Sequence, residues 1–369
     1  MGALAEIFRR HGPAYRARFA ARMPRDQLRA MRAIEACRTP ALGGHVWRCP
    51  QCGKERWSFH SCGNRHCPAC GQDDAREWLR CQEALRLPVT YHLCTFTVPE
   101  ELRGVIRSHP REGLAILFAA SSSTLLDLCA NPKWFGAQPG ATGVLHTWTR
   151  AQVYHPHIHY LVTGGGLAPD GFWREADPEF LVPVTALSPV FRARFRDALR
   201  KQLPETFAVI PKKVWQCDWV VHSKPVGNGE QALRYLSRYL YRVALADSAI
   251  LAHDEYRVTF RYRDSETGKS RKMTLTVMEF IRRFLQHVLP SGFVKIRHYG
   301  LHHPSRRKTL ALVRAALCVR KKIPLPVLPP PPEPKSCLCP TCQTPMMKLR
   351  MLTPVRTIPA RARAPPESP

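Results

Sequence analysis

The sequence predicts an α+β protein in which a small metal-stabilised domain precedes a larger domain with a mainly antiparallel sheet. Three observations predict this. From Cys37 to about Arg80 the chain is rich in Cys, His and Gly and holds little apolar material, so a metal must stabilise that segment. Strand-like and helix-like segments then interleave. From Pro324 onward the composition changes again, because 14 of the 34 prolines fall in the last 46 residues.

The length and charge of the chain bound its class of partner. A chain of 369 residues predicts two or three domains with at least one substantial core. Its 56 Lys and Arg against 28 acidic residues give a formal charge of +28, which predicts a polyanionic partner. A ribosomal or unspecifically basic protein and an enzyme acting on nucleic acid fit this charge equally well.

The N-terminus and the cysteines indicate a reducing compartment. The segment Met1 to Phe8 is too short for a signal peptide and is interrupted by Arg9 and Arg10, and we expect no apolar stretch of about 18 residues. The sequence therefore predicts a cytoplasmic protein, associated with the nucleoid of a bacterium. In such a compartment the 14 cysteines are poor disulfide candidates, and their spacing is interpreted first as metal ligation.

Residues 1–36 are expected to form a basic helical arm. Leu4, Ile7 and Phe8 share one helical face, and arginines are spread between the apolar positions. Contact with DNA and a merely solvated helix surface both fit this pattern.

Two Cys-x2-Cys pairs predict a zinc site in the next segment. Cys49/Cys52 and Cys67/Cys70 are separated by 14 residues, a spacing at which two tight turns can close a tetrahedron of thiolates. Four further candidates could form a second, interleaved zinc site: Cys37, His45, Cys62 and His66.

In the alternative interpretation, Cys62 and His66 only pack or contact DNA. If both sites are closed, no coordination position remains for catalysis, so the zinc is expected to be structural. The domain would then present basic side chains to nucleic acid: Arg48, Lys54, Arg56 and Arg65.

The larger domain is expected to alternate strands and helices. Apolar alternation predicts strands at 91–98, 142–148, 157–163, 214–221, 256–262 and 272–276. Helical periodicity predicts helices that end near Ala84 or span 114–128, 230–244 and 277–288. The glycines at 164–166 are expected to end the second long strand.

A His-x-His pair lies in one of these strands. His157 and His159 are two residues apart, so both imidazoles project from the same face of the strand. Alone this pattern is weak evidence, but two imidazoles and a third polar ligand would hold one divalent ion. The third ligand is left open among His146, Gln152 and His155.

Two tyrosines lie four residues apart in the helix predicted at 230–244. Tyr235 and Tyr239 share one helical face, a spacing that is more often structural than catalytic. Together with the histidine pair, the cysteine domain and the charge, the phenols become candidate nucleophiles. With a pKa near 10, a phenol is a good leaving group, so a phosphotyrosine would keep the bond energy needed for rejoining.

The proline-rich tail contains Cys337, Cys339 and Cys342, which amount to only half of a zinc site. Without a visible partner pair, the tail is expected to be unligated or weakly metal-bound, and its role stays open.

Several motifs in one order resemble the rolling-circle transposases typified by insertion sequence ninety-one, which are HUH endonucleases with two tyrosines. The segments that carry this resemblance lie at 7–15, 32–40, 62–68, 155–159, 235–243, 280–284 and 292–300. The region from Pro304 to Pro369, with its proline-rich linker and partial cysteine motif, is not aligned with the family, and its role stays open.

The resemblance implies an HUH-type catalytic domain with a central antiparallel sheet flanked by helices, behind the zinc domain. His157 and His159 would bind catalytic Mg²⁺ or Mn²⁺, and Tyr235 and Tyr239 would nick single-stranded DNA through a 5′-phosphotyrosine link. Arg238 between them would contact DNA, whereas Tyr241 is out of phase and interpreted as structural. The expected domains are a helical arm (1–36), a zinc domain (37–84), a catalytic domain (88–320) and a tail (321–369).

Two alternatives remain. One is a related relaxase or replication initiator, against which the zinc domain argues. The other is a non-catalytic, zinc-dependent DNA-binding protein, which would bind DNA without cleaving it.

Overall fold

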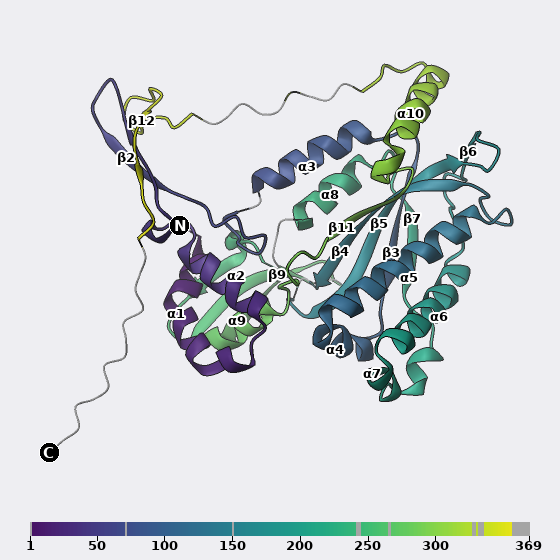
Figure 1. Ribbon diagram of the computed structural model, residues 1–369, viewed down its shortest axis with the longest axis horizontal. Helices are drawn as coiled ribbons and strands as arrows, with labels where there is room; N and C mark the ends of the chain where they lie inside the picture. The colour runs from purple at the N-terminus through teal and green to yellow at the C-terminus, as the bar shows by residue number, and fades with distance from the viewer. Residues whose placement is uncertain are drawn as a thin grey trace.

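A computed structural model describes residues 2–70, 72–149, 151–240, 245–264, 267–326, 330 and 336–355. The chain forms a large sheet layered between helices, a second helical and sheet body, and a small three-stranded sheet set apart from both (Figure 1). The predicted α+β class is confirmed. The predicted division into four domains stays a prediction, although several of its segments pack together, as described below.

The large sheet has the strand order β11-β4-β5-β3-β7, and β6 pairs with β5. Each of these pairs is antiparallel. Its strands are β3 (Tyr91–Thr97), β4 (Gln138–Trp148), β5 (Tyr154–Leu167), β6 (Trp173–Glu175), β7 (Val221–Pro225) and β11 (Ile296–Gly300).

Helices cover both faces of this sheet (Figure 1). One face carries α4 (Glu100–Ser108), α5 (Pro110–Ala130), α6 (Val184–Gln202) and α7 (Pro204–Ala208). The other face carries α3 (Gln72–Leu85), α8 (Glu230–Leu240) and α10 (Arg307–Lys321). Each face has its own apolar core, so side chains that alternate along a strand enter different cores.

Strand β5 illustrates this alternation. Ile158 and Tyr160 enter the core beneath α5 and α6, whereas Leu161 enters the core beneath α8. The strand continues through its glycines to Leu167, contrary to the expectation that it would end there. Glycine is required at these strand positions because neighbouring atoms leave no room for a side chain. A Cβ on Gly164 would lie 2.7 Å from the carbonyl oxygen of Thr90.

Helix α5 is apolar almost all round, as expected for a helix packed in a core. By length and composition alone it could cross a membrane, so the expectation that no such stretch exists is wrong. It lies against the large sheet with 61% of its most apolar window buried, which is typical of a core helix in a soluble fold.

The second body joins the N-terminal helices to residues 250–285 of the chain. Helices α1 (Ala3–Phe19) and α2 (Arg25–Ala36) pack against α9 (Val277–Leu285) and the sheet of β8 (Ile250–His253), β9 (Arg257–Arg263) and β10 (Ser270–Thr276). The rings of Phe8 and Phe284 lie 5.0 Å apart, edge to face. The N-terminal helices therefore share a core with a late part of the chain instead of forming a separate arm.

The small sheet has the order β12-β1-β2, formed by β1 (Gly44–Arg48), β2 (Glu55–Phe59) and β12 (Met347–Leu352). The proline-rich tail thus returns to the N-terminal cysteine segment and adds an antiparallel strand to it (Figure 1). The sequence indicated the linker but not the strand, because Met347–Leu352 is mostly exposed and lacks apolar alternation.

One predicted strand is wrong. Residues 214–221 form the end of a 3₁₀-helix at Lys212–Trp215 and a loop, and β7 begins only at Val221. The apolar side chains in this loop are explained by packing, because Val214 and Trp219 are buried under α6. The helix predicted at 230–244 is described only as far as Leu240.

The Phe8–Phe284 contact generates a stability prediction. Phe8→Ala should lower the free energy of unfolding by about 3–5 kcal/mol, because it empties a fully buried position between two segments of the second body. Urea unfolding followed by far-UV circular dichroism measures this. Leu312→Ala, at a side chain that is 73% exposed, should change it by less than about 0.5 kcal/mol. Equal effects of the two substitutions would contradict the shared core.

Candidate functional site

Three histidines from two neighbouring strands meet on the face of the large sheet that α8 covers. In the β4/β5 register His146 lies opposite His157, and Val144 lies opposite His159. The ring centroid of His146 lies 5.3 Å from that of His157 and 4.5 Å from that of His159. Ligand nitrogens of the three rings lie within 4.8 Å of one another, so the cluster can hold one metal ion.

Hydrogen bonds orient two of these rings. Nδ1 of His157 lies 2.7 Å from the carbonyl oxygen of His155, and Nδ1 of His159 lies 2.8 Å from Oγ1 of Thr95 on β3. With Nδ1 of His157 donating to the carbonyl, its Nε2 keeps a lone pair for a cation. The sequence did not single out Thr95, which reaches His159 only because β3 pairs with β5.

Burial keeps the three imidazoles neutral. It lowers the pKa of His157 to about 4 and the pKa of His159 to about 3, and it holds the pKa of His146 well below its usual range. Neighbouring imidazoles contribute to the lowered pKa of His146 and of His159, after the larger effect of burial. Neutral rings at pH 7 are the protonation state that metal ligation requires, so the donor set fits a divalent cation.

Helix α8 brings Tyr235 to this cluster. The centroid of the Tyr235 ring lies 6.2 Å from that of His159 and 6.4 Å from that of His146, and the side chain is 37% exposed. Leu233 and Leu236 of the same helix are buried in the core between α8 and the sheet, and this packing fixes the position of α8. Tyr239 lies one helical turn further along α8, but its side chain is outside the described residues, as is that of Arg238.

The geometry separates the two histidines that are candidates for the third ligand. Among the described His, Cys, Asp and Glu residues, His146 belongs to the cluster and His155 does not. His155 contributes its carbonyl oxygen to His157, and the side chain of Gln152 is buried at a residue whose φ is +60°. His146 is therefore the candidate that the structure favours.

The sequence analysis did not identify three residues that pack next to the histidine cluster, Trp148, His287 and Lys295. His287 packs against the ring of Trp148, with centroids 5.7 Å apart, and Nζ of Lys295 lies 4.8 Å from the same indole centroid. Burial and, to a lesser extent, the nearby Arg65 guanidinium lower the pKa of Lys295 to about 7. Lys295 lies inside the segment 292–300, which carried part of the family resemblance, but no spacing rule indicated its role.

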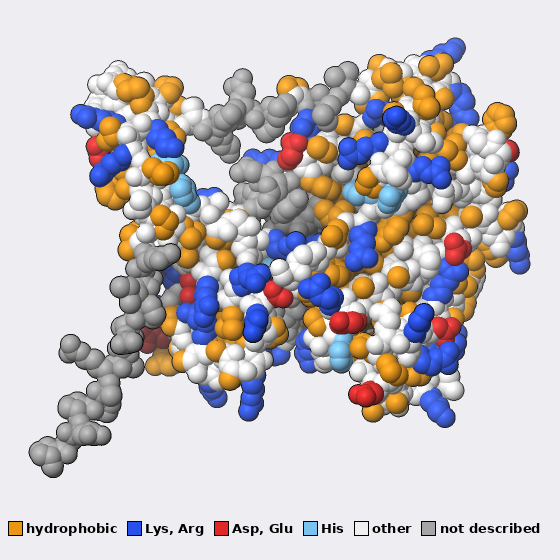
Figure 2. Space-filling model, viewed as in Figure 1, with side chains coloured by type: hydrophobic (Ala, Val, Ile, Leu, Met, Phe, Trp, Pro, Cys, Tyr) orange, Lys and Arg blue, Asp and Glu red, His pale blue; other side chains and the backbone are white. Residues whose placement is uncertain are grey.

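A basic groove lies beside the cluster. It holds a volume of about 270 Å³ between α4, the start of β5 and α9. Its lining includes Arg103, Arg107, Arg282 and Arg283. Arg103 also lowers the pKa of His157, so its charge acts on the histidine cluster. Figure 2 shows Lys and Arg side chains over much of one face of the molecule, with few acidic ones among them.

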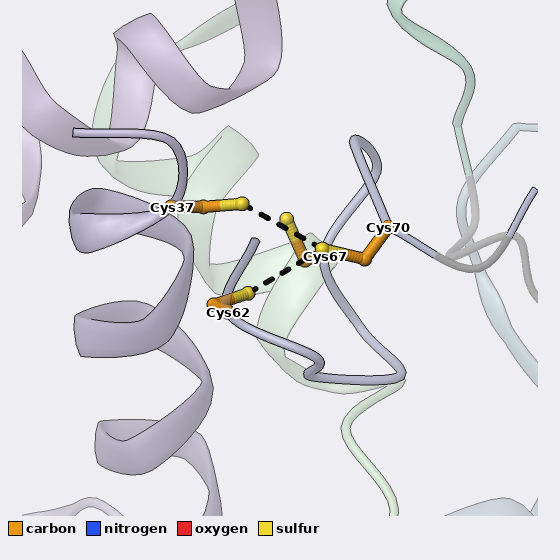
Figure 3. Close-up of side chains that lie close together, drawn as sticks. All are labelled: Cys37, Cys62, Cys67 and Cys70. Atoms are coloured by element: carbon orange, nitrogen blue, oxygen red, sulfur yellow. Dashed lines mark hydrogen bonds between the residues drawn. The ribbon is translucent and has the colours of Figure 1, made fainter. Parts of the chain in front are cut away.

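The cysteines form two clusters whose membership differs from the predicted one. In the first cluster Cys37, Cys62, Cys67 and Cys70 point toward one another (Figure 3). The Sγ atom of Cys70 lies 3.6 Å from that of Cys37 and 3.7 Å from that of Cys62. Cys37 follows the last residue of α2, and the other three come from the loop after β2.

In the second cluster, Cys49 and Cys52 meet Cys339 and Cys342 of the tail. The predicted set of Cys49, Cys52, Cys67 and Cys70 is thus corrected. The spacing between the two pairs suited a common site, but the pairing depends on where α2 and β12 lie, and the sequence does not encode that locally.

His45 and His66 lie outside both clusters, contrary to the predicted second zinc set. His45 faces His60, with their Nε2 atoms 3.2 Å apart. Nε2 of His66 accepts a hydrogen bond from the backbone N–H of Leu289, and burial lowers the pKa of His66 to about 3. Of the two alternatives considered for His66, packing is the one observed.

The candidate DNA-contacting side chains of the zinc region are all exposed, and three of them also make protein contacts. Nζ of Lys54 lies 3.1 Å from Oγ1 of Thr341, and a guanidinium nitrogen of Arg56 lies 3.4 Å from the carbonyl oxygen of Leu338. Arg65 donates to the carbonyl oxygen of Phe293 at 2.6 Å. Contact of these residues and Arg48 with DNA stays a prediction.

Two family models match the chain. Residues 7–98 match the family described as "Transposase zinc-binding domain", of the IS91 type, and residues 140–309 match the family described as "Putative transposase". The first match covers the first cysteine cluster and the N-terminal half of the second. The other match covers the three histidines, α8 and β11.

Relatives with curated names agree. The chain is 40% identical over 334 residues to "Putative transposase y4qJ" of Sinorhizobium fredii, covering 85% of this chain and 84% of that protein. It is 29% identical over 286 residues to "Transposase for insertion sequence element IS801" of Pseudomonas savastanoi pv. phaseolicola, covering 72% and 67% of the two chains. No solved structure matches the chain.

A domain with an antiparallel sheet follows a zinc-binding segment, and the two family matches occur in the same order. The chain is therefore a transposase with an N-terminal zinc-binding domain. Within that class, the chain belongs to the family of the IS91 and IS801 transposases, whose transposition is of the rolling-circle type. The family resemblance expected from the sequence is thereby confirmed.

The histidine cluster generates a metal-binding prediction. His146→Ala should weaken Mn²⁺ binding by more than about 100-fold, because loss of a direct ligand should cost more than loss of an outer partner. Electron paramagnetic resonance of Mn²⁺ in the zinc-loaded protein measures this. His155→Ala is the matched control, since the carbonyl oxygen that orients His157 survives the substitution. Undiminished Mn²⁺ binding by His146→Ala would exclude His146 as the third ligand.

Proposed function

We propose that this transposase nicks and rejoins single-stranded DNA at the ends of its insertion sequence through a 5′-phosphotyrosine intermediate. The observation that carries the proposal is the Tyr235 ring beside the cluster of His146, His157 and His159. Neither half of this arrangement is informative alone, but together they bring a candidate nucleophile to a candidate cation site.

In the proposed reaction the Oη atom of Tyr235 or Tyr239 attacks the scissile phosphorus. An Oη–P bond forms, the bond from phosphorus to the 3′-oxygen breaks, and the phenolic proton is lost while the 3′-oxygen gains one. Bound Mg²⁺ or Mn²⁺ would polarise the phosphate and offset its developing negative charge. Attack by a 3′-hydroxyl on the phosphotyrosine reverses the step, so the strand is rejoined without an external energy source.

The second phenol fits the needs of strand transfer. Tyr239 follows Tyr235 by four residues on α8, and positions at this spacing lie on one face of a helix. With two nucleophiles one site could hold a covalent strand while it cuts another.

The basic groove between α4 and α9 is the proposed path of the DNA backbone toward the histidines. Its arginines are partly paired with acidic side chains: Arg282 and Arg283 both contact Glu279, and Arg103 contacts Glu100. Guanidinium groups suit phosphate oxygens because they donate in pairs.

The zinc-binding domain is proposed to have a structural role. All four donors of each cysteine cluster come from the protein, and four protein ligands leave no position for a reacting group. We further propose that the protein acts in the bacterial cytoplasm, on the DNA of the nucleoid.

Two other functions are compatible with a histidine cluster and a zinc-binding domain. A relaxase or replication initiator would use the same histidine and tyrosine chemistry, but the family matches are to transposases. A non-catalytic, zinc-dependent DNA-binding protein would bind the element ends and leave them intact, so a cleavage assay separates it from the proposal.

The nucleophile assignment predicts loss of a covalent adduct. Labelled single-stranded oligonucleotides from the element ends, incubated with protein and Mg²⁺ or Mn²⁺, should yield a protein–DNA adduct that resists denaturing electrophoresis. Replacing both Tyr235 and Tyr239 with Phe should abolish it, because no phenolic oxygen remains to attack. Tyr256→Phe, at an exposed tyrosine of the second body, should leave it unchanged. Survival of the adduct in the double variant would refute the assignment.

The electrostatic interface predicts binding that depends steeply on salt. With a net charge of +28, the logarithm of the affinity for single strands should fall by about 0.7 per phosphate contact for each unit of log salt concentration. Fluorescence anisotropy across a salt series measures the slope. Arg103→Ala should remove one phosphate contact and so reduce the slope by about 0.7. Binding that does not depend on salt would contradict the electrostatic interface.

A further inference from the structure

The tail cysteines lie in a second four-thiol cluster that spans the chain. Cys52 and Cys339 are 287 residues apart in sequence, yet their Sγ atoms lie 3.5 Å apart. Sγ of Cys342 lies 3.4 Å from that of Cys49 and 3.8 Å from that of Cys52. We propose that these four cysteines bind one structural zinc ion, so that the tail completes a zinc ribbon begun by the N-terminal segment.

The sulfur geometry fits a tetrahedral ion. Zinc–thiolate bonds of about 2.3 Å place the corners of a regular tetrahedron about 3.8 Å apart. The Sγ–Sγ distances of 3.4, 3.5 and 3.8 Å fall at or slightly below this value. Cys337 lies outside the cluster, and its Sγ contacts the sulfur of Met346 at 4.0 Å.

The two halves of the cluster are built alike. The N-terminal knuckle (49–54) and the tail knuckle (339–344) both begin Cys-Pro-x-Cys. In each, the N–H of the first cysteine donates to the carbonyl of the sixth residue, and the N–H of the fifth donates back to the carbonyl of the first. The fifth residue has positive φ in both, +72° at Gly53 and +56° at Gln343.

This shared turn exposes sulfur to backbone donors. The N–H groups of Thr341 and Cys342 point at the Cys339 sulfur. A tight turn with N–H groups directed at sulfur is suited to zinc, because the metal binds the deprotonated, negatively charged sulfur.

The apolar core around the cluster is too small to hold the tail without a metal. It contains three buried side chains, Cys49, Cys339 and Met346, with Trp47 packed against them. Among the described residues, the other contacts of the tail are polar. They include β-ladder bonds between β1 and β12, the bonds from Lys54 and Arg56 to the tail, and a bond from the N–H of Val355 to the carbonyl of Pro40. Segments with so little buried apolar surface fold only when metal binding supplies the missing free energy.

The first cysteine cluster is a separate site with a different frame. Its donors come from the end of α2 and the loop that contains the third Cys-Pro-x-Cys motif, at 67–70. The full chain should therefore bind two zinc ions, and only the second should depend on the tail.

Zinc stoichiometry in the full-length protein tests the proposal. Inductively coupled plasma mass spectrometry should find two zinc ions per chain in the native protein. It should find one in a variant with Cys339→Ser and Cys342→Ser, and one in a variant with Cys49→Ser and Cys52→Ser. Combining all four changes should still leave one, because both pairs serve the same ion. The matched control, Cys81→Ser with Cys217→Ser, should keep two.

Retention of two zinc ions in the Cys339/Cys342 variant would overturn the proposal. So would loss of a second ion when the two pairs are combined.

A measurement on the unmodified protein guards against variants that fail to fold. A short pulse of alkylating reagent, read by mass spectrometry, should label Cys337 but spare Cys339 and Cys342 while zinc is bound. Removal of zinc by a chelator should expose Cys339 and Cys342 together with Cys49 and Cys52. If Cys339 and Cys342 react as fast as Cys337 while Cys49 and Cys52 stay protected, the tail is not a ligand.

Discussion

The pairing of β4 with β5 is the constraint on which the rest of the site depends. It lays His146 against His157 and leaves His159 two residues further along the same face. Successive strand residues alternate between faces, so a slip of one residue would turn His157 and His159 into the core beneath α5 and α6. The close fit of Gly143 against the Tyr160 ring, where a Cβ would lie 2.6 Å from a ring carbon, holds this register.

Hydrogen bonds connect the loop of the first cysteine cluster to the sheet that carries the three histidines. The loop carrying Cys62, Cys67 and Cys70 also carries Arg65 and His66, which bond to the backbone at Phe293 and Leu289. That backbone leads into Lys295, whose carbonyl oxygen accepts a bond from the N–H of Leu145, next to His146. Metal ligation in the first cluster therefore stabilises a segment that supports the β4 edge of the site.

The sequence predicted what depends on local pattern. The α+β class, the zinc-binding segment and the strand positions around His157 and His159 follow from alternation and spacing, and the structure contains them. It could not predict which cysteines share a cluster, because β12 joins β1 across the whole chain. It also missed Thr95 and Lys295, since ordinary residue types acquire a role only when a neighbouring strand brings them to the histidines. The strand predicted at 214–221 failed because Val214 and Trp219 are buried by a loop under α6.

The 287-residue separation between Cys52 and Cys339 has a consequence for biosynthesis. At about 5–20 residues per second, roughly 15–60 s pass between the emergence of the first pair of sulfurs from the ribosome and the arrival of the second. During this interval the large sheet and both helical layers can assemble, whereas the ribbon cannot close. Ribbon closure is thus among the final folding events, and it distinguishes a finished polypeptide from one released early.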